Sequence, residues 1–151
     1  MIRRGVQLTV LGLATAGVLA GCDDASGPGE FAGSYRLERF EGRDLPAIRS
    51  ISPRDTVYVV TEDLLLDDDG DGVVATTARR VGVSFPQGST SSSARPVRYT
   101  VRDGVITIVA RCPIDADCIG IAPLTGQLVP GGLAFGAPES SKPASFYRRT
   151  R

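Results

Sequence analysis

The stretch 97–110 reads Val-Arg-Tyr-Thr-Val-Arg-Asp-Gly-Val-Ile-Thr-Ile-Val-Ala and carries the clearest structural pattern in the chain. Two β-prone runs flank Asp103-Gly104, a dipeptide that supplies the positive φ angles of a type I′ turn, so the stretch predicts a two-residue β-hairpin. The register gives one wholly apolar face, whose cross-strand pairs are Val97 with Ala110, Tyr99 with Ile108, and Val101 with Ile106. A slip of one residue would turn every side chain to the other face, so the register is well specified.

Other short β-prone segments lie on both sides of this hairpin. They are Ser34–Phe40, Thr56–Thr61, Leu64–Leu66, Val73–Phe85, Leu133–Phe135 and Ser145–Arg149, with Ile119–Val129 as a looser candidate. Pro86–Pro96 is rich in serine, glycine and threonine and is expected to form a loop. About eight strands at short spacing predict an all-β fold, a small antiparallel up-and-down β-barrel, with a β-sandwich as the alternative. The barrel is preferred because closure removes exposed sheet edges.

The N-terminal segment has the features of an export signal. Arg3 and Arg4 precede an apolar run over Val6–Leu19, and small residues then lead to a cysteine in Leu-Ala-Gly-Cys at 19–22. The run is too short to remain as a membrane span. The tetrapeptide resembles the lipobox of bacterial lipoproteins, in which the cysteine receives a diacylglyceryl thioether, the preceding peptide is removed and the new amine is acylated. The resemblance implies a signal peptide over residues 1–21 and lipidation of Cys22.

Lipidation of Cys22 would determine where the protein is found. Each buried lipid methylene contributes about 0.8 kcal/mol, and two or more acyl chains hold a protein on a bilayer stably. We therefore expect an exported protein anchored to the bacterial cell membrane, on its periplasmic or outer surface, with the membrane as a partner. Residues 22–30 contain little to bury and are expected to form a flexible tether. Residues 31–151 then form one domain.

Several short motifs resemble uncharacterised bacterial lipoproteins with a lipocalin-like domain. The motifs are Gly33–Leu37, Gly42–Ala47, the Asp-Gly hairpin and the terminal Phe146–Arg149. The resemblance spans most of residues 31–149 and implies a lipocalin-like β-barrel. It also implies that an arginine of the last strand, Arg148 or Arg149, covers the first aromatic residue, which is Tyr35 here where lipocalins usually have tryptophan.

Cys112 and Cys118 remain after Cys22 is assigned to lipid. An exported chain meets an oxidising compartment, so these two cysteines are expected to form a disulfide. Closing so short a loop stabilises by about 2.4 kcal/mol in the chain-entropy model. The alternative is a metal or redox pair, but the spacing is not Cys-x-x-Cys and the sequence has no histidine to complete a zinc site.

The run Asp67–Gly72 is the candidate metal site. Asp67, Asp69 and Asp71, with the glycine that follows, match positions one, three, five and six of a calcium-binding loop, and alternating carboxylates suit a hard cation. Position twelve is Ala78, where a glutamate is expected. The alternative is a polar hairpin turn in which aspartate and glycine satisfy backbone requirements. Apart from calcium, no cofactor is expected.

The composition argues against two broad functions. Removal of Arg3 and Arg4 with the signal leaves 15 basic residues against 17 acidic ones, without a basic run, so nucleic acid is not an expected partner. The sequence has no histidine, and Lys142 is its only lysine. General-base and nucleophilic catalysis therefore lack their usual residues, and the protein is not expected to be an enzyme.

Two functions remain compatible with these features. In the first, the barrel binds a small apolar ligand, and the residues expected to line it are Tyr35, Leu37, Tyr58, Tyr99 and Ile108. In the second, the same side chains simply fill the interior. The protein is then a structural or interaction lipoprotein of the cell envelope, whose partner is another envelope protein or a polysaccharide.

Overall fold

The structure, a computed structural model, describes residues 27–111, 122–136 and 144–151. Within these residues it contains one short helix and ten strands. In chain order they are α1 (Pro28–Phe31), β1 (Gly33–Phe40), β2 (Arg43–Asp44), β3 (Ala47–Ile51), β4 (Asp55–Leu66), β5 (Asp71–Gly82), β6 (Phe85–Arg102), β7 (Val105–Ala110), β8 (Leu124–Val129), β9 (Gly132–Phe135) and β10 (Ser145–Arg149). The prediction of an all-β fold is therefore confirmed.

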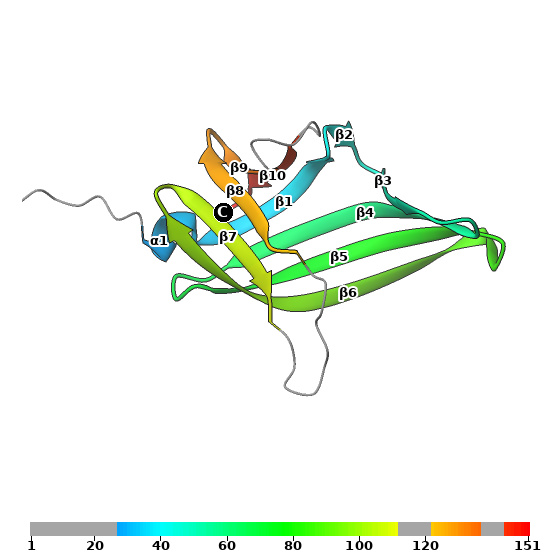
Figure 1. Ribbon diagram of the computed structural model, residues 1–151, viewed down its shortest axis with the longest axis horizontal. Coiled ribbons are helices and arrows are strands. Elements are labelled where there is room, and N and C mark those ends of the chain that lie inside the picture. The colour runs from blue at the N-terminus through cyan, green and yellow to red at the C-terminus, as the bar shows by residue number, and fades with distance from the viewer. Residues whose placement is uncertain (1–26, 112–121, 137–143) are drawn as a thin grey trace, which may run out of the picture.

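Eight of these strands close into an antiparallel barrel (Figure 1). The order is β1-β10-β9-β8-β7-β6-β5-β4, and β1 pairs again with β4 to close the ring. The closing pairs run from Gly33 opposite Leu66 to Arg36 opposite Asp63. From β4 to β10 the neighbours in space follow the chain, as in an up-and-down barrel. The predicted small barrel is confirmed, and the sandwich alternative is wrong.

The hairpin formed by β6 and β7 has the predicted register. Its pairs run without interruption from Val97 opposite Ala110 to Arg102 opposite Val105. The turn residues Asp103 and Gly104 have φ angles of 52° and 71°, and a type I′ turn requires positive φ at both of these positions.

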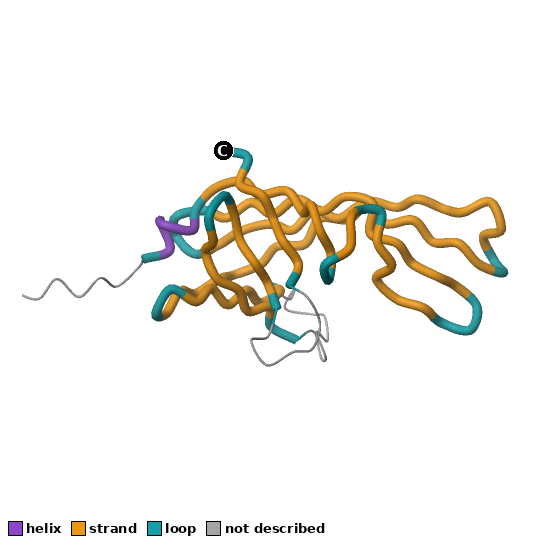
Figure 2. The backbone as a smooth tube through the Cα atoms, turned by 90° about the horizontal axis from the view of Figure 1, so that it is seen from above, coloured by secondary structure: helices purple, strands orange, loops and turns teal. Residues whose placement is uncertain are grey.

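Beyond the barrel, β3 and parts of β4, β5 and β6 form a projecting arm (Figure 2). We define the arm as residues 47–61, which include β3 and the first part of β4, together with residues 77–92 of β5 and β6. In the arm β4 pairs with β3 and with β5, and β5 pairs with β6. The arm and α1 lie at opposite ends of the molecule in both views (Figures 1 and 2).

The arm corrects two expectations about its strands. The predicted loop over Pro86–Pro96 is wrong, because these residues belong to β6 and pair with β5. Serine and threonine are common in loops, yet they also fit an exposed strand once a neighbouring strand supplies hydrogen bonds. Thr56–Thr61 and Leu64–Leu66, read from the sequence as separate segments, are parts of the single strand β4.

A register shift in β4 changes which of its residues face the core. Between Val59 and Thr61 the pairing with β5 skips one residue, as in a β-bulge. Val59 is buried before the shift, and Glu62 and Leu64 are buried after it. Tyr58 precedes Val59 by one residue and therefore faces the opposite side of the sheet. The expectation that Tyr58 lines the barrel interior is wrong.

The core is formed by apolar and aromatic side chains from the barrel strands, from α1 and, at Ala47 and Val59, from the base of the arm. The buried ones are Phe31, Tyr35, Leu37, Ala47, Val59, Leu64, Leu66, Val97, Tyr99, Ile106, Ile108, Leu133, Phe135 and Tyr147. Full burial of one such large side chain contributes about 1.5–3 kcal/mol. Phe31 comes from α1, so residues 28–30 of the expected tether are helical and adjoin the core. Residues 22–26 lie outside the described residues.

Replacing Gly132 by alanine is expected to destabilise the barrel. A Cβ atom at this position would lie 1.9 Å from the backbone oxygen of Tyr147, and the backbone cannot yield without opening the pairing of β9 with β10. We expect the free energy of unfolding, measured by urea denaturation, to fall by at least about 1–3 kcal/mol, the usual cost of overpacking. Gly29→Ala is the matched control, because nothing lies within 4 Å of a Cβ there. Equal stability of the two variants would contradict the register of β9 and β10.

Candidate functional site

The barrel interior is the first place to look for a binding site. Tyr35, Leu37, Tyr99 and Ile108, four of the five residues expected to line a ligand cavity, are buried there together. They pack within one cluster of buried side chains. The fifth, Tyr58, lies on the arm. The structure therefore gathers four of the expected residues into a packed core.

The hydroxyls of two of these tyrosines are used inside the molecule. Tyr35 donates to the carbonyl oxygen of Phe31 at 2.8 Å. The hydroxyl of Tyr99 lies 2.9 Å from the carbonyl oxygen of Pro28 and 2.5 Å from that of Asp67. Burial raises the pKa of Tyr35, and it raises the pKa of Tyr99 to about 12, so both groups are donors at neutral pH. These hydroxyls hold α1 and the turn between β4 and β5 against the barrel.

An arginine of the last strand covers the first aromatic residue, as the lipoprotein resemblance implies. The guanidinium of Arg149 lies 5.7 Å from the centre of the Tyr35 ring, a cation–π contact. Its Nη2 donates to the carbonyl oxygen of Ala32 at 2.6 Å. Arg148 instead pairs with Glu38, its Nε lying 2.5 Å from Oε1. The expectation is confirmed with Arg149 in this position.

A buried carboxylate lies where the arm meets the barrel. Glu62 on β4 is only 4% exposed. Its Oε2 accepts from Thr76 Oγ1 at 2.6 Å and from Arg49 Nη1 at 3.2 Å, and its Oε1 accepts from the hydroxyl of Tyr147. Burial is the main cause that raises the pKa of Tyr147 well above its ordinary value, and the charge of Glu62 adds to it. The three partners come from β5, β3 and β10, so this carboxylate joins the arm to the barrel wall.

Sequence reasoning missed the Glu62 cluster, although a pattern in β4 could have found it. Glu62 stands two residues before Leu64 and four before Leu66, and alternate residues of a strand face the same side. A charged residue inside such an apolar series predicts a buried carboxylate that needs partners. The partners themselves could not be identified, because they depend on strand pairing.

The expected calcium loop forms the turn between β4 and β5. The carboxylate of Asp71 accepts from Arg98 Nε at 3.3 Å and from Arg111 Nη1 at 2.8 Å, and Asp69 Oδ1 accepts from the Asp71 backbone N–H at 3.0 Å. In the described part of the chain, no group of three or more His, Cys, Asp or Glu residues could hold a metal ion. The structure thus does not bring Asp67, Asp69 and Asp71 together as a cation site, and the carboxylates of Asp69 and Asp71 are engaged by a turn bond and by two arginines.

Tyr58 lines a groove of about 480 Å³ on the arm. Tyr58, Arg79 and Thr90 stand opposite one another on β4, β5 and β6. The remaining lining residues are Pro46, Val60 and Val81. The groove therefore combines apolar walls and an aromatic ring with one guanidinium group, which suits a ligand that is partly apolar and partly anionic.

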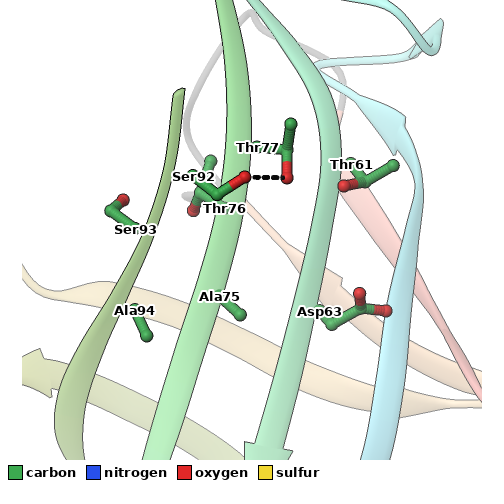
Figure 3. Close-up of a pocket in the computed structure, with 8 residues that line it drawn as sticks. All are labelled: Thr61, Asp63, Ala75, Thr76, Thr77, Ser92, Ser93 and Ala94. Atoms are coloured by element: carbon green, nitrogen blue, oxygen red, sulfur yellow. Dashed lines mark hydrogen bonds between the residues drawn. The ribbon is translucent and has the colours of Figure 1, made fainter. Parts of the chain in front are cut away.

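A second hollow, of about 280 Å³, lies where the arm joins the barrel (Figure 3). Thr61, Thr77 and Ser92 form a row across β4, β5 and β6, and the hydroxyls of Thr77 and Ser92 are 3.0 Å apart. Asp63 also lines the hollow, and its carboxylate pairs with Arg36 at 2.8 Å. Hydroxyls both donate and accept hydrogen bonds, so this surface suits the polar groups of a peptide backbone or a sugar.

Several predicted features fall on residues that the structure does not describe. Cys22, Cys112 and Cys118 lie outside the described residues, so lipidation and the disulfide stay predictions. Lys142 lies there as well. Of the helices in the described part of the chain, none is long and apolar enough to cross a membrane.

Comparison with known proteins finds no match to this chain, whether among protein-family models, curated proteins or solved structures. Its function is therefore inferred from its own residues and geometry.

The stability of the protein is expected to fall as the pH rises above about 10. Folding raises the pKa of Tyr99 from 10.0 to about 12 and that of Tyr147 well above 10.0. In this range the unfolded chain loses protons that the folded chain keeps, so the free energy of unfolding decreases with pH. Urea denaturation between pH of about 9 and about 12 measures the slope.

Phenylalanine variants assign that slope to individual hydroxyls. Tyr99→Phe and Tyr147→Phe are each expected to make the decline shallower, because each removes one proton that only the folded state retains. Tyr58→Phe, on the arm, is the matched control outside the core. A slope that neither core variant alters would show that these two tyrosines are not buried as described.

Proposed function

We propose that this chain is a lipid-anchored protein of the bacterial cell envelope whose function is to bind another protein (a contact function). In this proposal the arm binds another envelope protein, and the lipocalin-like barrel is its rigid base. The protein has no enzymatic role. The observation that carries the proposal is the arm itself, which projects beyond the barrel and ends in exposed apolar side chains.

The arm contributes little to closing the barrel. β1 pairs with β4 only over residues 63–66, at the barrel end of that strand. Toward its end the arm exposes Ile51 at 73%, Val83 at 79% and Phe85 at 37%. Exposed large apolar side chains on a projecting part of a protein can mark an interaction site. If the arm binds another protein, these exposed apolar side chains become buried against the surface of that protein.

The packed interior supports contact over carriage of a ligand. The inward side chains fill the barrel, and the hydroxyls of Tyr35 and Tyr99 bind carbonyl groups of the same chain. A ligand inside the barrel would have to displace core side chains, each of which contributes about 1.5–3 kcal/mol through burial. An apolar ligand therefore has little room where the sequence alone would place it.

The ends of the molecule also suit an anchored contact protein. The arm lies opposite α1 (Figures 1 and 2), and the predicted lipid attachment at Cys22 shortly precedes α1 in the chain. With Cys22 in the bilayer, the arm extends away from the lipid surface. This orientation presents the exposed tip to other molecules of the envelope.

Fatty acids, retinoids and haem-like compounds are expected to leave the thermal stability unchanged. A ligand present at 100 times its Kd stabilises a protein by about 2.7 kcal/mol, which corresponds to a Tm shift of several degrees in a domain of this size. Differential scanning fluorimetry of the purified protein measures the shift. A reproducible increase in Tm with any of these compounds would favour carriage of a ligand.

Site-specific photo-crosslinking in intact cells tests the contact function. A photoreactive amino acid in place of Val83, at the tip of the arm, is expected to give one discrete crosslinked species. That species should fractionate with membranes, and mass spectrometry should identify the same partner in repeated experiments. The matched control is Val109, an exposed valine on the barrel strand β7. Monomer alone at Val83, or the same products at both positions, would contradict the proposal.

A further inference from the structure

Along the arm, no other strand of the described residues pairs with the outer edge of β6. β6 has 18 residues, and only Val97–Arg102 pair with β7. The backbone N–H of Arg111 donates to the carbonyl oxygen of Pro96 at 2.9 Å, next to the last residue pair of β6 with β7. From Phe85 to Arg95, β6 pairs with β5 alone among the strands that the structure describes. A long row of backbone donors and acceptors therefore faces outward.

Over residues 89–94 this edge lacks the devices that usually keep a free strand from pairing. Natural edge strands are short, or they carry charged residues, prolines or bulges. Residues 89–94 read Ser-Thr-Ser-Ser-Ser-Ala, without a charge, a proline or a register shift. Pro86, the register shift and Gly88, whose φ is 81°, lie nearer the tip of the arm. β3, at the other edge of the arm, has only five residues and carries Arg49 at a register shift. The β6 edge is thus the better acceptor for an additional strand.

Arg79 and Arg80 lie on β5, the strand that pairs with β6, and they favour a negatively charged partner at this edge. Arg79 faces Thr90 and Arg80 faces Ser89, and consecutive residues of β5 project to opposite faces of the sheet. Neither arginine has a carboxylate partner within the described residues. Both faces of the edge therefore have a guanidinium group available to an incoming strand.

The side chain of Arg79 already reaches over β6. A Cβ built on Gly88 would lie 2.7 Å from Arg79 Nε and 3.1 Å from its Nη2, so the guanidinium lies against the backbone of the edge strand. Arg80 lies over the Phe85 ring, 6.0 Å from its centre. The short side chains of Ser89 and Thr90 leave space above the edge. Neighbouring strands are about 4.8 Å apart, so a glutamate on an added strand can reach back to meet these guanidinium groups.

We propose that the edge of β6 over residues 89–94 accepts an extended acidic segment of a partner protein as an added β-strand. Backbone hydrogen bonds supply the pairing, and carboxylates next to Ser89 and Thr90 pair with Arg80 and Arg79. The proposal rests on the contact function of the arm and specifies the chemistry of its partner.

A second copy of this chain fits the same edge less well. β6 contains no acidic residue. The whole arm has four arginines and one aspartate, a net charge of +3. Two such edges brought together would place arginines from both copies along one seam without a carboxylate from either edge, and like charges across paired strands destabilise them. An acidic segment gains from the same arginines.

The probe is a capped, fluorescently labelled octapeptide with two central glutamates between alternating threonine and valine residues. Binding to the full lipidated chain in detergent is measured by fluorescence anisotropy, and hydrogen exchange reports protection of residues 89–94. The double variant Arg79→Glu/Arg80→Glu is expected to weaken binding about tenfold, the effect of losing two exposed ion pairs. Arg102→Glu is the matched control, because Arg102 is an exposed arginine of β6 on the barrel side. Equal affinity in both variants would overturn the charge assignment.

A peptide methylated at alternate backbone nitrogens tests the strand pairing itself. It carries the same charges but cannot form the backbone ladder, so it is expected to lose both binding and protection of β6. Equal binding of the methylated peptide would overturn strand addition. Dimers of the protein alone that protect residues 89–94, detected by analytical ultracentrifugation and hydrogen exchange, would make a second copy the occupant and overturn the acidic segment.

The two proposals fail in different ways. Discrete crosslinks from Val83 without peptide protection of β6 would leave the contact function standing and remove strand addition. Protection of β6 by the peptide without crosslinks from the arm in cells would remove the contact function, on which the assignment of a partner protein rests.

Discussion

The pairing of β1 with β4 is the constraint from which the shape of the molecule follows. It covers only the pairs from Gly33 opposite Leu66 to Arg36 opposite Asp63. β4 and β5 each have 12 residues and β6 has 18, so closure of the ring uses one end of these strands and leaves the other end without barrel partners. Within the part of the chain that the structure describes, the same strands therefore produce a closed barrel wall and an arm whose β6 edge has no paired strand.

The base of the arm depends on a buried charge. A carboxylate removed from water is unfavourable unless it is paired and hydrogen-bonded. Glu62 meets this requirement with Thr76, Arg49 and Tyr147, which lie on three different strands. Loss of any one partner would leave part of the carboxylate unsatisfied. The cluster thus fixes β3, β5 and β10 relative to one another, and its groups are occupied by structural bonds.

Sequence patterns were sufficient where burial and local turn chemistry agree. The register of the hairpin around Asp103-Gly104 followed from alternation alone, and the lipoprotein resemblance led correctly to an arginine over Tyr35. The patterns failed for Pro86–Pro96 and for Tyr58, because an exposed strand and a β-bulge are determined by the neighbouring strand. Asp67–Gly72 was ambiguous from the start, since a turn and a calcium loop require the same residue types.

The continuity of β4, β5 and β6 from the tip to the barrel also has a mechanical consequence. β4 spans about 40 Å at the usual rise per residue, and its ladder with β5 continues from one end to the other with a single shift. A force along the arm is therefore carried as shear across many hydrogen bonds in parallel. We therefore expect the arm to be stiff along its length. A displacement of the tip of the arm would then be transmitted through β4, β5 and β6 to the barrel.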